Sequence, residues 1–316
     1  MAILTTPGMA AETGTEAVRR RLQSQRVDVG GVVFRIAILA ALGFSILVLG
    51  VLLYDVVTGG WSVLSGRFGS FWSGTLRSQA EEAGIAQGIR GTVWIGVFVV
   101  LLAFPLGVGA AMYLEEYAPD NRLVRLVDVN IRNLAGVPSI VYGILGFAIF
   151  VKALGGLTGG RSVIAAGITL AVLVLPIVII TSAEALRAVP TGLKEAGMGL
   201  GATRWEVLRH HTLPYAAPGI LTGTVLALAR ALGEAAPLIL VGAVQTRLGD
   251  NPGVLDLGSL GEKFTAMPIV ITTWAGVPQT GFRANTAAAI VVLLVVVLVA
   301  NGAAILLRNR FEKKRG

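Results

Sequence analysis

The sequence contains no cysteine, so its 316 residues can form neither a disulfide nor a thiolate metal site. Charged residues make up only 14% of the chain, whereas a soluble domain carries roughly a quarter. Lysine is scarce too, and none of the five lysines lies in the GxxxxGK[ST] pattern that cradles nucleotide phosphates. The chain therefore does not hydrolyse ATP through a Walker A site of its own.

What the chain has instead is apolar length. Hydrophobic residues make up 54% of it, and the mean hydropathy is +0.77. Segments of about 20 apolar residues are long enough to cross a bilayer, and six are present. We predict an all-α integral membrane protein with six transmembrane helices, at about Val32–Leu53, Gly88–Leu114, Asn133–Val151, Ser162–Ser182, Pro218–Val244 and Ala284–Leu307.

The distribution of basic residues predicts the orientation. The chain has a net charge of +8, and most Lys and Arg residues lie in the two tails and in the segments at 115–132 and 183–215. Cytoplasmic segments of membrane proteins carry this excess, so we expect a multi-pass membrane protein with both termini in the cytoplasm. A secretory signal is a competing interpretation of the N-terminus, but the apolar run there is too long for one.

Four segments follow from this topology. We predict a cytoplasmic tail at 1–31, the first transmembrane helix with an external loop at 32–87, a domain that holds the other five spans at 88–308, and a basic cytoplasmic tail at 309–316.

The stretch from Glu195 to Pro214, EAGMGLGATRWEVLRHHTLP, is a polar segment between two predicted spans. We predict a helix at about 190–209 that projects into the cytoplasm, with Pro214 ending the element. Gly197 and Gly201 are spaced to leave a smooth face for close approach, and an amphipathic helix laid in a groove is a common docking mode. The alternative is a connector helix that lies on the membrane surface.

The fifth predicted span contains an arginine and a glutamate. Arg230 and Glu234 are four residues apart, so they share one helix face. An arginine at the centre of a span costs about 2.5–3.5 kcal/mol on insertion scales, so such residues are functional candidates by default. We assign Arg230 and Glu234 to a substrate pathway for an anion; a neutralised pair that braces the bundle is the alternative.

Small residues recur every four positions in the same span, and such a ridge lets another helix approach closely in lipid. We predict a helix-packing role for Gly219, Gly223, Ala227 and Ala231. The GxGxG run at Gly197 follows no strand, and the adjacent histidines His210 and His211 point in different directions on a helix. We expect neither a metal site nor a bound cofactor in this chain.

The Glu195–Pro214 stretch resembles the EAA loop of ABC-importer permeases, with Glu195, Ala196, Gly201, Leu213 and Pro214 in register. Gly197 stands in place of the third-position alanine, and His211 in place of the isoleucine. The region from about Gly88 to Leu307 resembles the permease domain of type I (MetI-like) ABC importers. The segments EALRAVPTGLKEAGMGLGATRWEV and LARALGEAAPLILVG are most similar to the PstA-type subunit of bacterial phosphate importers.

The resemblance implies a permease subunit of an ATP-driven importer of inorganic phosphate in the bacterial inner membrane. Its expected partners are a homologous PstC-like permease, two ATPase subunits that carry ATP and magnesium, an external phosphate-binding protein and the lipid bilayer, but no nucleic acid. Docking of the ATPase falls to Glu195, Ala196, Gly197, Gly201, Leu213 and Pro214. Alternatives are a permease for sulfate or molybdate, a channel or ion-driven carrier, and a membrane enzyme.

Overall fold

The computed structural model of the chain describes residues 29–245 and 256–312, and every regular element in these ranges is a helix. The chain divides into two compact units, Met1–Asp55 and Val56–Gly316, which are described separately. The longer helices are α2 (Val29–Gly66), α4 (Ala86–Met112), α5 (Arg122–Ala135), α8 (Val163–Arg187), α11 (Leu213–Gly233) and α14 (Thr280–Glu312). The shorter ones are α3 (Phe68–Ser73), α6 (Ser139–Gly146), α7 (Gly155–Thr158), α9 (Thr191–Gly199), α10 (Arg204–Val207), α12 (Ala236–Val241), α13 (Met267–Ala275) and the 3-10 helix η4 (Gly258–Gly261). Three π-helical segments are η1 (Tyr113–Tyr117), η2 (Phe147–Ala153) and η3 (Leu208–Thr212).

The described part of the first unit is the N-terminal portion of α2. Its apolar side chains are exposed throughout, and its most apolar window makes no buried contact. The predicted span Val32–Leu53 lies inside this helix, but α2 continues to Gly66, so the loop predicted at 54–87 is helical over its first part. Most of the predicted N-terminal tail, and residues 313–316 of the C-terminal tail, lie outside the described residues.

The prediction of six membrane-spanning segments is confirmed if one bent pair counts as a span. Five helices are long and apolar enough to cross a bilayer. The sixth would be α5 followed by α6 and η2, which meet at an angle of 101°. The predicted span at about Asn133–Val151 crosses this bend, where Gly136–Pro138 interrupts the helix because a proline disfavours helical backbone in the residue before it.

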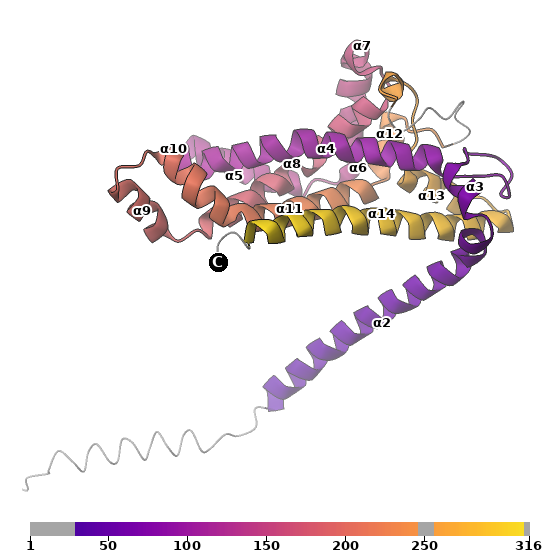
Figure 1. The fold of residues 1–316 in the computed structure, drawn as a ribbon, viewed down its shortest axis with the longest axis horizontal. Coiled ribbons are helices and arrows are strands. Elements are labelled where there is room, and N and C mark those ends of the chain that lie inside the picture. Colours follow the sequence, from indigo (N-terminus) through magenta and orange to yellow (C-terminus); the bar gives the residue numbers. More distant parts are fainter. Residues whose placement is uncertain (1–28, 246–255, 313–316) are drawn as a thin grey trace, which may run out of the picture. The chain divides into compact units, whose positions relative to one another are not determined.

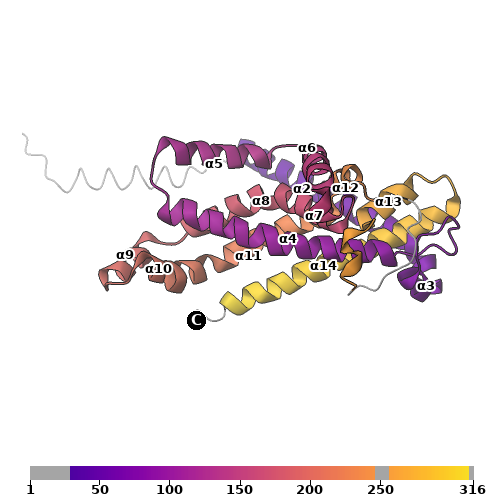
Figure 2. The same cartoon turned by 90° about the horizontal axis from the view of Figure 1, so that it is seen from above.

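In the second unit, α4, α8, α11 and α14 run lengthwise and pack against one another (Figure 1, Figure 2). Helices α4 and α8 approach closely through glycines: a Cβ on Gly107 would lie 2.6 Å from Val178, and one on Gly167 would lie 2.5 Å from Phe98. Short helices complete the two ends, with α9 and α10 at one and α3 and α13 at the other. We call these the α9 end and the α13 end.

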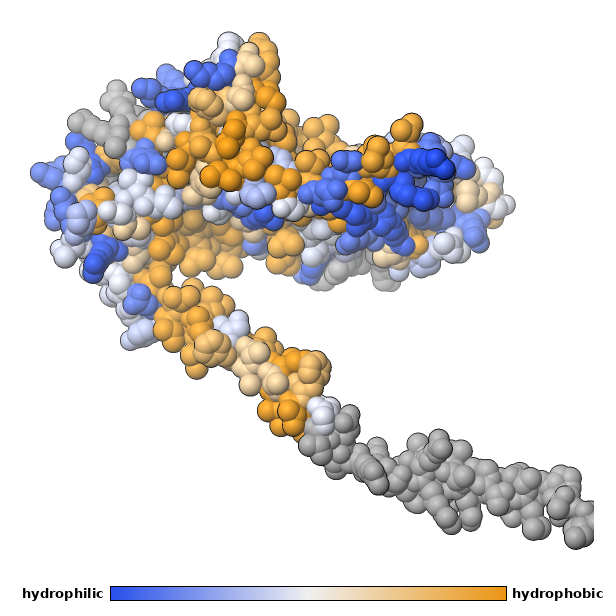
Figure 3. Space-filling model, turned by 180° about the vertical axis from the view of Figure 1, so that it is seen from behind, coloured by the Kyte–Doolittle hydropathy of each residue, from blue (hydrophilic) through white to orange (hydrophobic). Residues whose placement is uncertain are grey.

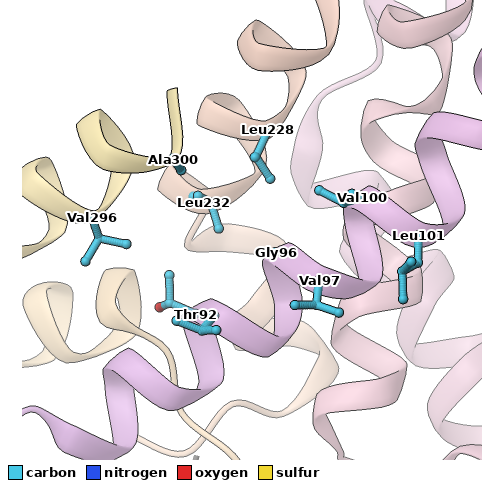
Figure 4. Close-up of a pocket in the computed structure, with 10 residues that line it drawn as sticks. Thr92, Gly96, Val97, Val100, Leu101, Leu228, Leu232, Val296 and Ala300 are labelled. Atoms are coloured by element: carbon cyan, nitrogen blue, oxygen red, sulfur yellow. The ribbon is translucent and has the colours of Figure 1, made fainter. Parts of the chain in front are cut away.

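The surface has an apolar middle. Figure 3 shows hydrophobic side chains over the central part of the second unit and hydrophilic ones gathered towards the α9 end. A cavity of about 310 Å³ lies among α4, α11 and α14, where Val97, Leu228, Leu232 and Val296 face it (Figure 4). Its one hydroxyl, on Thr92, already accepts a hydrogen bond from the Met267 backbone N–H at 2.8 Å. This cavity has no charged lining residue, so it does not suit an anion.

Candidate functional site

The candidate substrate site lies where the fifth span is interrupted. Helix α11 ends at Gly233, Glu234 has an extended backbone (φ −80°, ψ 123°), and α12 begins at Ala236. The predicted continuous span Pro218–Val244 is therefore wrong at its second half, and Arg230 is in the last turn of a helix rather than at its middle. A cation is favourable in that turn because the partial negative charge of the helix dipole lies there.

Arg230 and Glu234 still meet across the interruption. Arg230 Nε lies 3.4 Å from Glu234 Oε1, and the two side chains are 44% and 20% exposed. Among the described residues, no acceptor binds the two terminal nitrogens of the guanidinium. Those nitrogens are parallel donors of the kind that bind two oxygens of a carboxylate or phosphate together. Arg230 thus has one weak ion-pair partner, which contacts Nε, and its two terminal nitrogens can donate to an anion.

A second interrupted helix packs beside the first. Helix α6 begins directly after the break at Gly136–Pro138 and packs against α12 so closely that a Cβ on Gly143 would lie 2.7 Å from Pro237. Tyr142, only 7% exposed, donates its hydroxyl to the carbonyl of Leu134 across the break, at 2.9 Å. Non-helical backbone at membrane depth is tolerated only where protein buries it or where it lines a cavity. Two such breaks side by side single out this region.

The small-residue ridge of α11 lies against α8 over part of its length. Gly223, Ala227 and Ala231 are buried, and a Cβ on Gly223 would lie 2.1 Å from the hydroxyl of Thr181. Gly219 is more exposed, yet a Cβ there would lie 2.7 Å from that of Ala185. Gly219 and Gly223 thus lie on the contact between α11 and α8, and Ala227 and Ala231 belong to the main buried cluster.

The predicted docking element is a helical hairpin. Helix α9 begins at Thr191 after Pro190 and ends at Gly199, so it is shorter than the predicted 190–209. The chain then reverses into α10, which begins with a capping box between Thr203 and Glu206. Figures 1 and 2 show the two helices side by side at the end of the bundle.

Gly201 makes the turn of this hairpin. Its φ is +85°, a left-handed conformation that strains any residue with a Cβ. The Gly201 N–H donates to the Met198 carbonyl at 2.9 Å, and the Ala202 N–H donates to the Gly197 carbonyl at 3.3 Å. These two bonds are those of the Schellman motif that closes helix C-termini. The spacing of Gly201 is thus explained by backbone geometry, without a partner.

The predicted docking residues do not share one surface. Glu195 and Ala196 are exposed on α9, but Gly197 is buried, and a Cβ there would lie 2.9 Å from Val207 of α10. Leu213 and Pro214 lie in the first turn of α11, which continues from η3 without a break. Pro214 therefore does not end the element: the helix continues through it, and the π-helical segment η3 lies directly before α11.

The hairpin also carries exposed apolar residues; Trp205 was predicted to offer apolar bulk together with Leu208, which is buried, whereas Leu200 and Met198 were not predicted. Leu200 at the tip is 91% exposed, Trp205 is 53% exposed and Met198 is 47% exposed. An isolated exposed apolar residue is ordinary on a protein surface. Three on one polar hairpin make it suitable for contact with another protein, and a leucine between two glycines at a helix end was the available signal.

Two ion pairs join the α9 end to the bundle. Consecutive glutamates on η1 each bind a cation from another element: Glu115 binds Arg187, the last residue of α8, and Glu116 binds Lys194 of α9. Neither pair was predicted from the sequence, because the partners are more than 70 residues apart along the chain. Among the described residues, no cluster of His, Asp or Glu could hold a metal ion.

The described residues include five helices that are long and apolar enough to cross a membrane, and two helices of the bundle are interrupted. Residues 103–313 match the family of the binding-protein-dependent transport system inner membrane component. This match covers well over half of the chain, which therefore belongs to that family of ABC-importer permeases.

Curated relatives include several phosphate-system permeases. The chain is 37% identical over 195 residues to "Phosphate transport system permease protein PstA 1" of Mycobacterium tuberculosis, a match that covers 60% of this chain and 62% of that protein. It is 31% identical over 250 residues to "Phosphate transport system permease protein PstC" of Mesorhizobium japonicum, covering 71% of this chain and 76% of that one. The match to "Probable ABC transporter permease protein YqgI" of Bacillus subtilis, at 35% identity, covers 63% of that protein. The chain thus spans less than two thirds of the length of some of these relatives.

Solved structures agree on the fold. A bacterial ABC transporter involved in alginate import superposes with a TM-score of 0.61 at 16% identity, over 89% of this chain and 98% of that one. The MetNI methionine ABC transporter in an inward-facing conformation gives 0.52 at 21% identity, over 72% and 94%. The predicted MetI-like permease fold is therefore confirmed.

Proposed function

We propose that this chain is the permease subunit of an ATP-driven importer of inorganic phosphate. The observation that carries the proposal is the conjunction of two facts: relatives at up to 37% identity are phosphate-system permeases, and Arg230 lies at a break in a transmembrane helix with two terminal nitrogens that meet no acceptor among the described residues. A guanidinium of this kind can donate two parallel hydrogen bonds to phosphate oxygens.

The subunit acts in a complex. A homologous PstC-like permease completes the pathway, two ATPase subunits bind ATP and magnesium on the cytoplasmic side, and an external phosphate-binding protein delivers the anion. The exposed face of α9, with Glu195, Ala196 and the tip residue Leu200, contacts an ATPase subunit. Because ATP binding alters the affinity between the ATPase subunits, it shifts the population between outward-open and inward-open states.

Glu234 lowers the affinity of Arg230 for the anion. A carboxylate beside the guanidinium lowers its net attraction for an anion, so phosphate is held and then released rather than trapped. The 3.4 Å separation and the single shared nitrogen make this a weak partnership that an incoming oxyanion can replace.

Uptake by cells tests the proposal. A strain lacking its own phosphate importer, supplied with this chain and its partner subunits, should accumulate radiolabelled phosphate and not sulfate. Sulfate uptake with no phosphate uptake would favour the other-oxyanion alternative. Phosphate transport that persists without an ATPase subunit would favour an ion-driven carrier.

The anion role of Arg230 has its own variants. Arg230→Gln should abolish uptake while the complex still assembles, and Arg230→Lys should retain part of it because a point charge replaces the fork. Arg77→Gln, which alters an exposed external arginine, is the matched control. Normal uptake with Arg230→Gln would remove Arg230 from the pathway.

A further inference from the structure

Consecutive glutamates at the cytoplasmic-side end of α4 bind cations from two different elements. Arg187 donates to Glu115 with both Nε, at 2.8 Å, and Nη2, and the pair joins η1 to the end of α8. Lys194 Nζ lies 2.5 Å from Glu116 Oε1 and joins η1 to α9. One short segment of chain therefore holds both a transmembrane helix and the proposed docking helix.

Both glutamates belong to the π-helical segment η1. Residues Tyr113–Tyr117 form a π-helix that follows α4 directly, and π-helical segments are frequent at functional sites. Glu115 and Glu116 are only 15% and 17% exposed, so their charges are partly removed from water. Partly buried ion pairs are screened less by salt than exposed ones.

An apolar contact accompanies the ion pair to α9. Leu193, the residue before Lys194, packs on a buried cluster that includes Leu186, Val189 and Leu208. Beyond Lys194 the outer face of the helix is exposed through Glu195 and Ala196 to the tip. Helix α9 is thus attached to the bundle near its beginning and projects from there.

We propose that Glu116 and Lys194 are positioning residues that fasten α9 to α4, so that a displacement of α9 moves α4 with it. This inference rests on the proposed function, since it concerns how motion of the ATPase reaches the pathway. Glu115 and Arg187 hold the end of α8 to the same segment. Without the Glu116–Lys194 pair, α9 follows the ATPase while α4 lags behind it.

The Glu116–Lys194 pair is the better one to test. Arg187 also has Asp128 and Glu184 in its electrostatic neighbourhood, so the loss of Glu115 leaves it other acids. Lys194 has no other carboxylate within ion-pair distance among the described residues. The Arg125–Asp120 pair, with side chains 75% and 92% exposed, is a matched control ion pair.

The first experiment measures coupling in the full complex. The permease pair, the ATPase and the binding protein are reconstituted in proteoliposomes, and phosphate uptake is divided by ATP hydrolysed. Glu116→Gln and Lys194→Met should each assemble normally and lower this ratio by at least about fivefold, the lower range of coupling between sites. The exchange Glu116→Lys with Lys194→Glu should recover much of it, and Asp120→Asn should leave it unchanged.

The second experiment reads the fastening without transport. Because the chain has no cysteine, Leu106→Cys on α4 and Met198→Cys on α9, both exposed in the parent chain, place two spin labels in this chain, and the complex is purified with cysteine-free partner subunits. Electron–electron double resonance should give a narrow distance distribution, broadened by Glu116→Gln and narrowed again by the charge exchange.

The outcomes separate the two proposals. An unchanged distance distribution, or an unchanged ratio of phosphate to ATP in Glu116→Gln, would overturn the fastening and leave the proposed function standing. If the parent complex moves no phosphate, the proposed function fails, and the spin-label distances still decide whether Glu116 holds α9 to α4.

Discussion

The α13 end and the α9 end of the second unit are each stabilised by a different kind of interaction. At the α13 end, Phe71 is fully buried and stacks with Trp274, which in turn stacks with Phe282. Arg67 there donates to three backbone carbonyls and to Asn285 Oδ1 at 2.5–3.1 Å. Burial lowers the pKa of the Arg67 guanidinium, and the nearby Glu81 carboxylate opposes the shift.

The α9 end has little of this. Its hairpin touches the bundle through Leu193, the Glu116–Lys194 pair and the buried side of α10, and its tip is exposed. Aromatic packing and hydrogen bonds to the backbone thus stabilise the α13 end, whereas the α9 end is attached to the bundle at a few points. The proposed contact with an ATPase subunit lies at the second of these ends.

The largest expected effect on stability is at Phe71. Phe71→Ala should lower stability by about 3–5 kcal/mol, because it removes a large buried side chain and leaves a cavity. The midpoint of unfolding by SDS in mixed micelles measures the change. Phe68→Ala on the same helix is the control, since Phe68 is 47% exposed. Equal losses of stability in the two variants would contradict the stabilisation of the α13 end by buried aromatic packing.

Arg67→Met should have the next largest effect. The substitution removes hydrogen bonds donated by a charged group, and one such bond contributes about 1.5–3 kcal/mol. Methionine keeps most of the apolar length of the arginine side chain. We expect a loss of about 2 kcal/mol in the same unfolding measurement. Arg77→Met, at an exposed external arginine, should change little, and a comparable loss there would show that charge alone matters.

Gly201→Ala tests whether strain in the hairpin at the α9 end leaves the stability of the bundle unchanged. A Cβ in the left-handed region costs about 1–2 kcal/mol, but the strain falls on a hairpin that the bundle does not depend on. We therefore expect faster proteolysis within 196–204 with little change in the global midpoint. Gly199→Ala is the control, because Gly199 is helical with open space around it; equal cleavage of both variants would rule out strain as the cause.

Leu200→Ser should leave stability within about 0.5 kcal/mol of the parent, as surface changes do, yet weaken co-purification of the ATPase subunit. Leu157→Ser alters another leucine that is 83% exposed and should not affect the ATPase. Full retention of the ATPase by Leu200→Ser would exclude the tip from the interface.

The sequence predicted much of the fold because hydrophobic length is a direct signal. The helices α4, α8 and α14 lie within a few residues of their predicted bounds. What failed were the interruptions: Gly136–Pro138 and Glu234–Ala235 lie inside apolar runs, and hydropathy does not register a break in direction. Asn121 caps α5, its side chain accepting from the Val124 N–H, but the sequence prediction placed only a charged segment at 115–132 and no helix.

The site was predicted unevenly for a similar reason. Arg230 and Glu234 were found because charge within an apolar run is conspicuous. The roles of Gly197 and Gly201 could not be separated, because spacing does not show that one packs on Val207 and the other closes a turn. The pairs of Glu115 and Glu116 depend on tertiary packing. The docking and pathway roles themselves stay predictions that the experiments above address.

The most direct measurement labels a single cysteine at Leu200 from each side of the membrane. The account predicts that a membrane-impermeant maleimide labels Leu200→Cys in inverted vesicles but not in intact cells, and that the bound ATPase subunit protects it. Labelling from outside intact cells would put α9 on the wrong side of the membrane and contradict the account.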